Sequence, residues 1–378
     1  MKIGIISVVG GYSWAGSEEM WNLFALEALR AGHSVLAAAQ EPIAKSEELA
    51  EFRRLGGRTL PYHPLNWILR RFSSRGWYSR YAPMRAWNPD LLCISGGSPD
   101  MHRQSDLMAY LATTKVPCVY IIQGNAEGYI GSQSERNALK PLYMTAAGIV
   151  CVSHANAALL ERQLATRLPS ITILPNPIRA KVDGPLPWPS AGNGMVKFAT
   201  VGRYEVGSKC QDRTLEALAT KDWKARNWEL NLFGSGPDQA YLADLICFYG
   251  LEDHVNLRGF ERDFRKIWGS QHIHILNSRA EGLALALIES MFCGRPAVIT
   301  RSGGNHELLR DDIDGFVSPG EDPEVIRQTL ELAWSNRDRW PAMGAKAFDR
   351  AVDWVPTDLS ARLFKVITRP NKAARTNL

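Results

Sequence analysis

The sequence predicts an α/β protein in which two doubly wound parallel-sheet domains follow one another along the chain. Short β-branched runs alternate with longer segments of helical periodicity, a pattern typical of parallel strands joined by helical crossovers. The same pattern starts again after a stretch rich in proline and glycine. The chain has 378 residues, which leaves room for two buried cores because a domain usually takes about 150 residues.

The first half of the sequence contains the elements of one such domain. Apolar β-branched runs predict strands at Lys2–Val8, Ser34–Ala38, Leu91–Ile94 and Cys118–Ile122. Between the first two runs, apolar residues at helical spacing predict a helix over Met20–Ala31, which Gly32 ends. We therefore predict a first domain over residues 1–180.

A linker and a second domain follow. Four prolines and several glycines interrupt any periodicity between Asn176 and Gly194, which is typical of a linker. Strands and helices are then predicted again, at Val196–Val201, Asp212–Ala219, Glu229–Phe233 and Ile273–Leu276. The second domain is predicted over residues 181–355. Ligands of doubly wound sheets bind at the carboxyl ends of strands, so functional residues are expected directly after them.

The composition is that of an ordinary globular protein and excludes disordered and fibrous classes. The six cysteines include no C-x-x-C pair, so we predict neither a zinc cluster nor a disulfide framework and expect reduced thiols. No run of about 20 apolar residues predicts a membrane-spanning helix, and the N-terminal apolar run is too short for a secretory signal. These features favour a cytoplasmic protein, and peripheral association with the inner face of a membrane stays open.

The densest functional signal lies between Asn277 and Met291, after an apolar strand. A strand, a polar turn and a helix leave backbone N–H groups at the helix start, where an anion such as a phosphate is stabilised. Glu281 lies at the turn and Glu289 follows two helical turns later, so the pair can accept hydrogen bonds from two sets of ligand hydroxyls. Taken alone, the two glutamates are better explained by Glu281 as a helix cap and Glu289 on a solvated helix face.

From Val201 onward the sequence resembles glycosyltransferase family 4, the glycosyl transferases group 1. The matching stretches keep their order and are Val201-Gly202-Arg203 with Lys209, Leu232–Pro237, Val255–Phe260, Glu281–Glu289, Gly294–Val298, Gly303–Glu307 and Asp314–Val317. The resemblance implies a GT-B fold, with two Rossmann-like doubly wound domains that face each other across a cleft. It also implies a retaining hexosyltransferase that uses a nucleotide-diphosphate sugar.

The resemblance implies roles for residues of the second domain. Arg203 and Lys209 clamp the diphosphate, which gains negative charge as the glycosidic bond breaks. Glu281 binds the sugar hydroxyls and Glu289 the ribose diol. The remaining donor contacts are expected from the backbone at Gly234, Phe260, Gly282, Leu283 and Ala284.

In the first domain the resemblance is thinner. Gly16 and Ser17 look like the glycine-rich first loop, whose backbone approaches the diphosphate, and a tight turn is the alternative. Many family members carry a histidine after the strand that ends at Ile122, but this sequence has Gln123, which cannot exchange protons near neutral pH. A retaining route tolerates Gln123, because the departing phosphate oxygen itself takes the acceptor's proton. His102 and His154 are more simply read as a solvent-facing and a structural histidine.

No metal ion or cofactor is expected, since the family generally works without one and no Asp-x-Asp motif follows a strand. The donor is expected to be a UDP- or GDP-sugar. Two alternatives remain open, a nucleotide-sugar 2-epimerase of the same fold and a catalytically idle sugar-nucleotide-binding protein.

The segment 52–89 bears on the acceptor. Between Phe52 and Pro89 the sequence has eight arginines interleaved with aromatic residues and no acidic residue. This composition fits an anionic membrane surface or an acidic acceptor, and it equally fits a loop whose aromatics are core. We expect a glycan or lipid-linked acceptor in cell-envelope or exopolysaccharide synthesis, and no nucleic acid. The C-terminal part, 356–378, follows a break at Pro356, and in similar folds its helix returns to the first domain.

Overall fold

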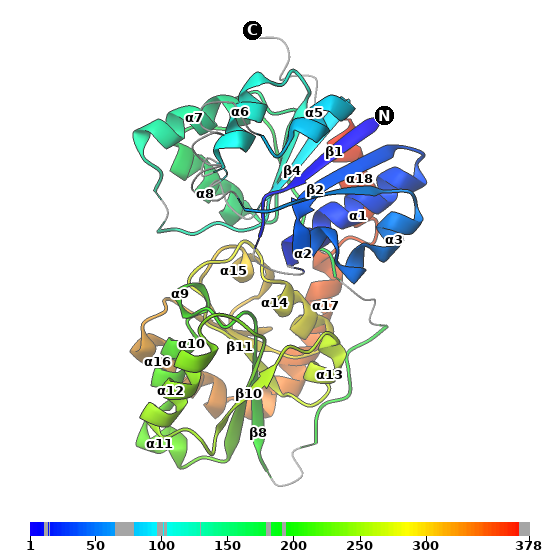
Figure 1. The fold of residues 1–378 in the computed structure, drawn as a ribbon. Helices are drawn as coiled ribbons and strands as arrows, with labels where there is room; N and C mark the ends of the chain where they lie inside the picture. The colour runs from blue at the N-terminus through cyan, green and yellow to red at the C-terminus, as the bar shows by residue number, and fades with distance from the viewer. Residues whose placement is uncertain are drawn as a thin grey trace. The chain divides into compact units, whose positions relative to one another are not determined.

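A computed structural model describes residues 1–10, 14, 16–64, 79–96, 101, 104–128, 130–178, 183–190 and 194–369 (Figure 1). They form two compact units. The first comprises Met1–Pro177 together with the segment from Thr357, and the second is Ile178–Pro356. Each unit is built round a parallel sheet with helices on both faces, so the predicted fold class of two doubly wound α/β domains is confirmed.

The sheet of the first unit has the strand order β3-β2-β1-β4-β5-β6-β7 over the described residues. All neighbouring pairs are parallel. The strands are β1 (Lys2–Ser7), β2 (Ser34–Gln40), β3 (Arg58–Tyr62), β4 (Leu91–Gly96), β5 (Cys118–Ile122), β6 (Gly148–Cys151) and β7 (Ile171–Ile173). The chain reverses its direction of strand addition between β1 and β4, which is where doubly wound sheets bind ligands.

Helices cover both faces of this sheet. Right-handed crossovers place α1, α2 and α3 on one face and α5 to α8 on the other. Their bounds are α1 (Gly16–Arg30), α2 (Glu41–Ala44), α3 (Ala50–Arg54), α5 (Ala82–Trp87), α6 (Ser105–Thr113), α7 (Gln133–Met144) and α8 (His154–Leu164). Because both faces are covered, the central strands β1, β4 and β6 are buried along nearly their whole length, as Ile3 and Ile5 of β1 illustrate.

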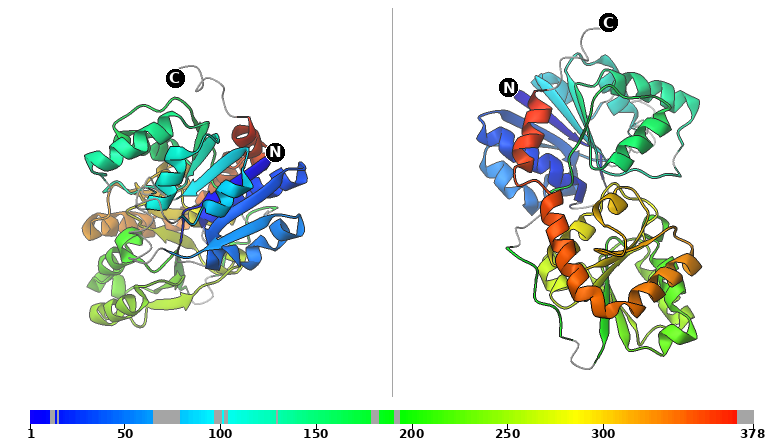
Figure 2. Two further views of the ribbon diagram at one scale, coloured as in Figure 1. Left: turned by 45° about the horizontal axis from the view of Figure 1, so that its top comes forward. Right: turned by 180° about the vertical axis from the view of Figure 1, so that it is seen from behind.

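The last helix, α18 (Leu359–Thr368), belongs to the first unit and packs against α1. The ring of Phe364 lies 6.4 Å from that of Phe24 and stacks on His33 at 5.6 Å. Figure 2 shows this helix beside the N-terminal segments. The preceding helix ends at Trp354, just before Pro356, so the predicted helix break is confirmed. The tail 370–378 lies outside the described residues.

The sheet of the second unit has the order β10-β9-β8-β11-β12-β13. Its strands are β8 (Val196–Val201), β9 (Trp228–Phe233), β10 (Val255–Gly259), β11 (Ile273–Leu276), β12 (Ala297–Thr300) and β13 (Gly315–Ser318). One face carries α10 (Gln211–Leu218), α12 (Gln239–Tyr249) and α16 (Pro323–Ser335). The other face carries α13 (Phe264–Trp268), α14 (Leu285–Phe292) and α17 (Trp340–Trp354). Shorter helices lie at the loops: α9 (Val206–Lys209), α11 (Lys221–Lys224) and α15 (Asn305–Leu308).

Most predicted elements have the observed bounds within one or two residues, and β5, β8 and β11 agree at both ends. The largest difference among them is α1, which begins at Gly16 rather than Met20. Its first turn is polar and therefore carries no apolar periodicity. Glu18 and Glu19 lie in that turn, where acidic side chains are stabilised by the positive end of the helix dipole.

The segment 183–190 packs on the second unit. The Leu186 N–H donates to the carbonyl of Cys293 at 3.2 Å. The fully buried Arg295 donates to the carbonyls of Leu186 and Pro187, and its guanidinium lies 5.3 Å from the Trp188 ring. One buried cation therefore holds this proline-rich segment in place.

Two general expectations can be compared with the structure. None of the six cysteines, all of which lie in the described ranges, forms a disulfide. Within those same ranges, no helix is both long enough and apolar enough to cross a bilayer.

Candidate functional site

The carboxyl ends of β8 and β11 form the candidate site of the second unit. These two strands are neighbours, with His274 of β11 opposite Ala199 of β8. They lie where the strand order reverses, so their following loops diverge and leave room for a ligand between them. Arg203 and Lys209 follow β8, and Glu281 follows β11.

Lys209 and Glu281 form an ion pair that joins the two loops. The Lys209 Nζ lies 2.5 Å from the Glu281 Oε1, and the two side chains are 19% and 10% exposed. The sequence predicted both residues for ligand contacts, but it gave no sign that they contact each other. A phosphate that binds Lys209 must therefore compete with this carboxylate.

Arg203 is also held by a carboxylate. Its guanidinium donates to Glu205, which accepts a second hydrogen bond from the Ser208 hydroxyl at 2.9 Å. The Gln211 side chain donates to the Arg203 carbonyl at 2.6 Å and fixes the backbone of this loop. Sequence reasoning missed Glu205. Its position two residues after Arg203 is a signal from which this ion pair could have been predicted.

The loop between β11 and α14 corrects one prediction. Because α14 begins only at Leu285, Glu281 lies in the loop and just Glu289 is helical. The two glutamates are therefore not two turns apart on one helix. The expected anion site at the helix start is also partly occupied, since the Ala284 N–H donates to Asn305 Oδ1 at 2.9 Å.

This loop is held by the glycines that follow β12. The Gly304 N–H donates to the carbonyl of Gly282 at 2.6 Å. A Cβ on Gly303, whose φ is +51°, would lie 2.0 Å from the Glu281 carbonyl oxygen. Gly303 therefore permits the close approach that positions Glu281, and Asn305 is a further site residue to which the sequence reasoning gave no role.

The loops after β9 and β10 lie beside those of β8. Gly234 has a φ of +149°, and a Cβ there would lie 1.9 Å from the Gly202 carbonyl oxygen. Its N–H donates to the carbonyl of Gly259 at 2.8 Å. Gly234 therefore allows the carboxyl ends of β8, β9 and β10 to approach one another closely. Phe260, which directly follows β10, is 69% exposed and presents its ring at the surface.

His274 lies fully buried beneath this loop region. Burial, together with the positive charge of Lys209, lowers the pKa of His274 to about 3. The ring is therefore neutral, and its Nδ1 lies 3.0 Å from the hydroxyl of Ser290 in α14. This contact joins β11 to α14, the helix that carries Glu289.

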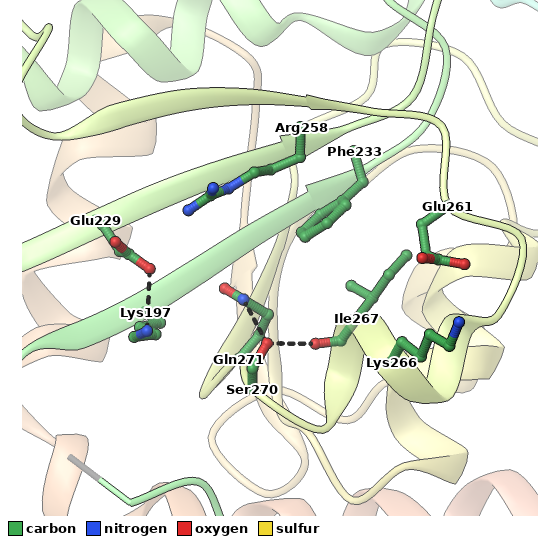
Figure 3. Close-up of a pocket in the computed structure, with 9 residues that line it drawn as sticks. All are labelled: Lys197, Glu229, Phe233, Arg258, Glu261, Lys266, Ile267, Ser270 and Gln271. Atoms are coloured by element: carbon green, nitrogen blue, oxygen red, sulfur yellow. Dashed lines mark hydrogen bonds and ion pairs between the residues drawn. The ribbon is translucent and has the colours of Figure 1, made fainter. Parts of the chain in front are cut away.

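A pocket of about 220 Å³ lies elsewhere in the second unit, between α13 and the face formed by β8, β9 and β10 (Figure 3). None of the predicted site residues lines it. Its polar groups largely satisfy one another: Glu229 contacts Lys197 at 3.3 Å, and Asn231 bonds Glu229, Gln271 and Arg258. The candidate site of the second unit is therefore placed at the loops after β8 and β11 rather than at this pocket.

The first unit carries the other predicted site residues. Gly16 is the first residue of α1, and the Ser17 hydroxyl lies 3.4 Å from Glu18 Oε1. Gln123 follows β5, where its N–H donates to the carbonyl of Gly96 at 3.2 Å. His154 begins α8, and His102 lies outside the described residues.

The basic segment 52–89 is described only outside residues 65–78. Arg80 is buried and forms a two-point ion pair with Asp106, with the closest N–O distance 2.7 Å and side chains 6% and 0% exposed. Its guanidinium also lies 4.8 Å from the ring of Tyr62, and Tyr81 is fully buried. For these residues the reading as a basic surface is wrong, because they belong to the core of the unit.

Glu18 is a buried carboxyl next to the predicted first loop. Burial raises its pKa to about 7, against the opposing effect of hydrogen bonds from Trp21, Ser7 and Ser17. Between pH 4.5 and 7 the folded chain keeps a proton that the unfolded chain has lost, so stability falls as the pH rises through this window. The loss amounts to roughly 3 kcal/mol for a shift of this size.

We expect Glu18→Gln to abolish this pH dependence. Urea unfolding at pH 5 and pH 8 measures the free energy of unfolding of both proteins. From pH 5 to pH 8 this free energy should fall more for the wild type than for Glu18→Gln. Glu27→Gln, on the same helix, should follow the wild type. Parallel pH profiles for the wild type and Glu18→Gln would show that Glu18 is ionised throughout.

The comparisons with known proteins agree with this geometry. Residues 196–336, which include both candidate loops, match the family model of glycosyl transferases group 1. Residues 196–336 therefore form a domain of the glycosyl transferases group 1. The predicted family is thereby confirmed.

Individual relatives resemble parts of the chain. An exopolysaccharide phosphotransferase of Streptomyces coelicolor is 28% identical over 226 residues, which are 58% of this chain and 23% of that protein. An uncharacterized glycosyltransferase of Haemophilus influenzae is 30% identical over 125 residues, 33% of this chain and 35% of that protein. The chain thus spans only about a quarter to a third of these relatives.

The crystal structure of HepE from Anabaena in complex with UDP and glucose is similar over 98% of both chains. The TM-score is 0.70 and the sequence identity is 16%. This likeness shows the GT-B fold.

Proposed function

We propose that this group 1 glycosyltransferase moves a hexose from a UDP- or GDP-sugar to a glycan or lipid-linked acceptor in cell-envelope or exopolysaccharide synthesis. The observation that carries the proposal is the Lys209–Glu281 pair at the switch point of the second sheet, with Arg203 on the same loop as Lys209. Two cations and a carboxylate suit a diphosphate and a sugar hydroxyl, respectively.

The proposed reaction is retaining and needs no metal ion. The bond between the sugar C1 and the diphosphate oxygen breaks, and a bond from C1 to the acceptor oxygen forms on the same face. The acceptor's proton passes to the departing phosphate oxygen. Arg203 and Lys209 stabilise the charge that develops on the diphosphate, which is the electrostatic term that usually contributes most to catalysis.

The other contacts complete the donor site. Glu289 is buried in the first turns of α14 and binds the ribose diol, and the exposed ring of Phe260 flanks the base. Gly282 and Leu283 contribute backbone groups, and Gln123 positions the acceptor. The crystal structures of HepE with UDP and with UDP-glucose support a uridine donor for a chain of this fold. The exopolysaccharide relative supports the pathway class.

Nucleotide binding tests the proposal directly. We expect UDP or GDP, with EDTA present, to raise the unfolding temperature, because a ligand at a hundredfold excess over its Kd contributes about 2.7 kcal/mol. Arg203→Ala should weaken this binding. Glu205→Gln should strengthen it, since Arg203 then no longer has to leave a carboxylate. If no nucleotide shifts the unfolding temperature, or if Arg203→Ala binds as the wild type does, the proposed donor site is wrong.

A further inference from the structure

Four buried polar side chains lie at the carboxyl edge of the first unit's sheet. Ser95 is in β4, Gln123 and Asn125 follow β5, and Asn156 lies in the first turn of α8, after β6. They are between 1% and 6% exposed. These three strands are consecutive neighbours in the sheet, so their carboxyl ends form one continuous edge.

Gln123, Asn125 and Asn156 are the buried side-chain amides of the described residues in which neither polar atom has a hydrogen-bond partner. The Ser95 Oγ and both polar atoms of each of the three amides have no hydrogen-bond partner among the described residues. A buried amide without a partner costs roughly 1–3 kcal/mol. Since most buried polar groups in folded proteins are paired, a group of four such residues at a ligand-binding edge points to an external partner.

Hydrogen bonds anchor the backbone that carries these amides. The Gln123 N–H donates to the Gly96 carbonyl at 3.2 Å. The Gln163 side chain of α8 donates to the Ala126 carbonyl at 2.8 Å and ties the loop after β5 to that helix. The Asn156 N–H donates to the Ser153 hydroxyl at 3.1 Å. The edge is thus preorganised, which lowers the entropic cost of binding a ligand there.

The chemistry of the four groups selects the ligand. Amides offer both donors and acceptors and carry no charge, as the hydroxyls of a sugar require. A phosphate or a carboxylate needs cations, and the charged residue of this loop, Glu127, is itself paired with Arg162. Arg80 of the basic segment is no substitute, because it is neutralised by Asp106.

We propose that this edge, made by Ser95, Gln123, Asn125 and Asn156, binds an uncharged saccharide. The inference rests on the proposed function only in assigning that saccharide to the acceptor of the transfer. Under this inference the acceptor is a neutral glycan that the protein recognises by hydrogen bonds. An acidic or lipid-phosphate acceptor, which cations would recognise, is not expected.

Apolar substitutions of the amides distinguish a role in saccharide binding from a role in the stability of the fold. Asn125→Leu and Asn156→Leu keep the number and branching of the side-chain heavy atoms but remove the unpaired amide, so each variant should unfold at the same or a higher temperature than the wild type. A structural amide would instead give a lower unfolding temperature. Asn137→Leu, on the exposed face of α7, is the matched control.

Binding is measured on the full chain by saturation-transfer NMR. The probes are methyl α-glucoside, methyl α-galactoside, N-acetylglucosamine and lactose, with glucose 6-phosphate and glucuronate as charged counterparts. We expect at least one neutral probe to bind at least tenfold more tightly than the charged ones. Asn125→Leu and Asn156→Leu should lose at least tenfold in affinity for it, and Asn137→Leu should not.

Several results would overturn the inference: no neutral probe binds, a charged probe binds equally well, or the isosteres bind normally. A lower unfolding temperature of both isosteres would also overturn it. If UDP-glucose binds more tightly than UDP and Asn125→Leu removes that difference, the assignment to the acceptor is overturned, because the amides then hold the donor's sugar. The UDP shift of the wild type is recorded in parallel. If UDP does not shift the unfolding temperature, that result counts against the donor site alone. The free saccharides test the edge formed by Ser95, Gln123, Asn125 and Asn156 without any nucleotide.

Discussion

Replacing Lys209 by alanine is expected to lower kcat for sugar transfer by about 10²–10³-fold, the usual effect of removing one preorganised charge from a transition-state site. The Lys209 ammonium is four-fifths buried at the switch point and contacts Glu281. Its attraction to a leaving diphosphate is therefore screened less than that of a surface lysine. The substitution also leaves the Glu281 carboxylate without its cation, so a negative charge then faces the diphosphate.

Initial rates at saturating donor measure this effect, with circular dichroism to show that the variant is folded. Lys221→Ala, at the exposed start of α11 in the same unit, should keep full activity. Lys209→Arg keeps the charge and should recover part of the rate. Should Lys209→Ala stay within threefold of the wild type, the transition state does not use this ammonium.

The fold could be predicted because each step depends on local patterns. Strands such as Cys118–Ile122 are short apolar runs bounded by polar turns, and in a sheet covered on both faces such runs need no long-range information to be recognised. The position of Arg203 and Glu281 after strands followed from the same logic, since a parallel sheet collects strand ends on one edge.

The contacts within the site could not be predicted in the same way. The Lys209–Glu281 pair joins residues 72 positions apart, and no spacing rule connects two loops that only meet when β8 and β11 become neighbours. The role of Asn305 likewise depends on Gly303, whose missing Cβ lets the loop after β12 reach the Glu281 carbonyl. The expected helical spacing of Glu281 and Glu289 is wrong for the same reason, because this tertiary contact holds residues 281–284 in a loop.

The unpaired amides show the limit of sequence reasoning most clearly. The sequence identified Gln123 as a departure from the family's histidine, but only as a single polar residue. The structure places it at the same sheet edge as Asn125 and Asn156, and none of the three side-chain amides has a hydrogen-bond partner among the described residues. Burial and missing partners are properties of the fold, and a sequence window cannot show them.

Arg295→Leu should have the largest effect on stability, a loss of about 3–5 kcal/mol in the free energy of unfolding of the second unit. Arg295 is fully buried, and burial lowers its pKa to about 10, so it stays charged at neutral pH. No carboxylate of the described residues forms an ion pair with its guanidinium. The guanidinium instead donates to the backbone carbonyls of Pro187 at 2.7 Å, Trp268 at 2.9 Å, Cys293 at 3.0 Å and Leu186 at 3.2 Å.

Leucine fills part of the volume but removes the donor that these carbonyls share. The Cys293 carbonyl keeps its hydrogen bond from the Leu186 N–H, and each carbonyl that stays buried without a partner carries its own desolvation cost. Lysine keeps the charge but cannot match the planar fork of donors, so Arg295→Lys should recover less than half of the loss. Arg265→Leu removes an exposed ion pair on α13 and should change stability by less than about 1 kcal/mol. Urea unfolding gives these values, and limited proteolysis of the segment 183–190 reports whether it detaches. If Arg295→Leu proved as stable as Arg265→Leu, the segment would be held by its proline and tryptophan contacts, and the buried cation would have another purpose.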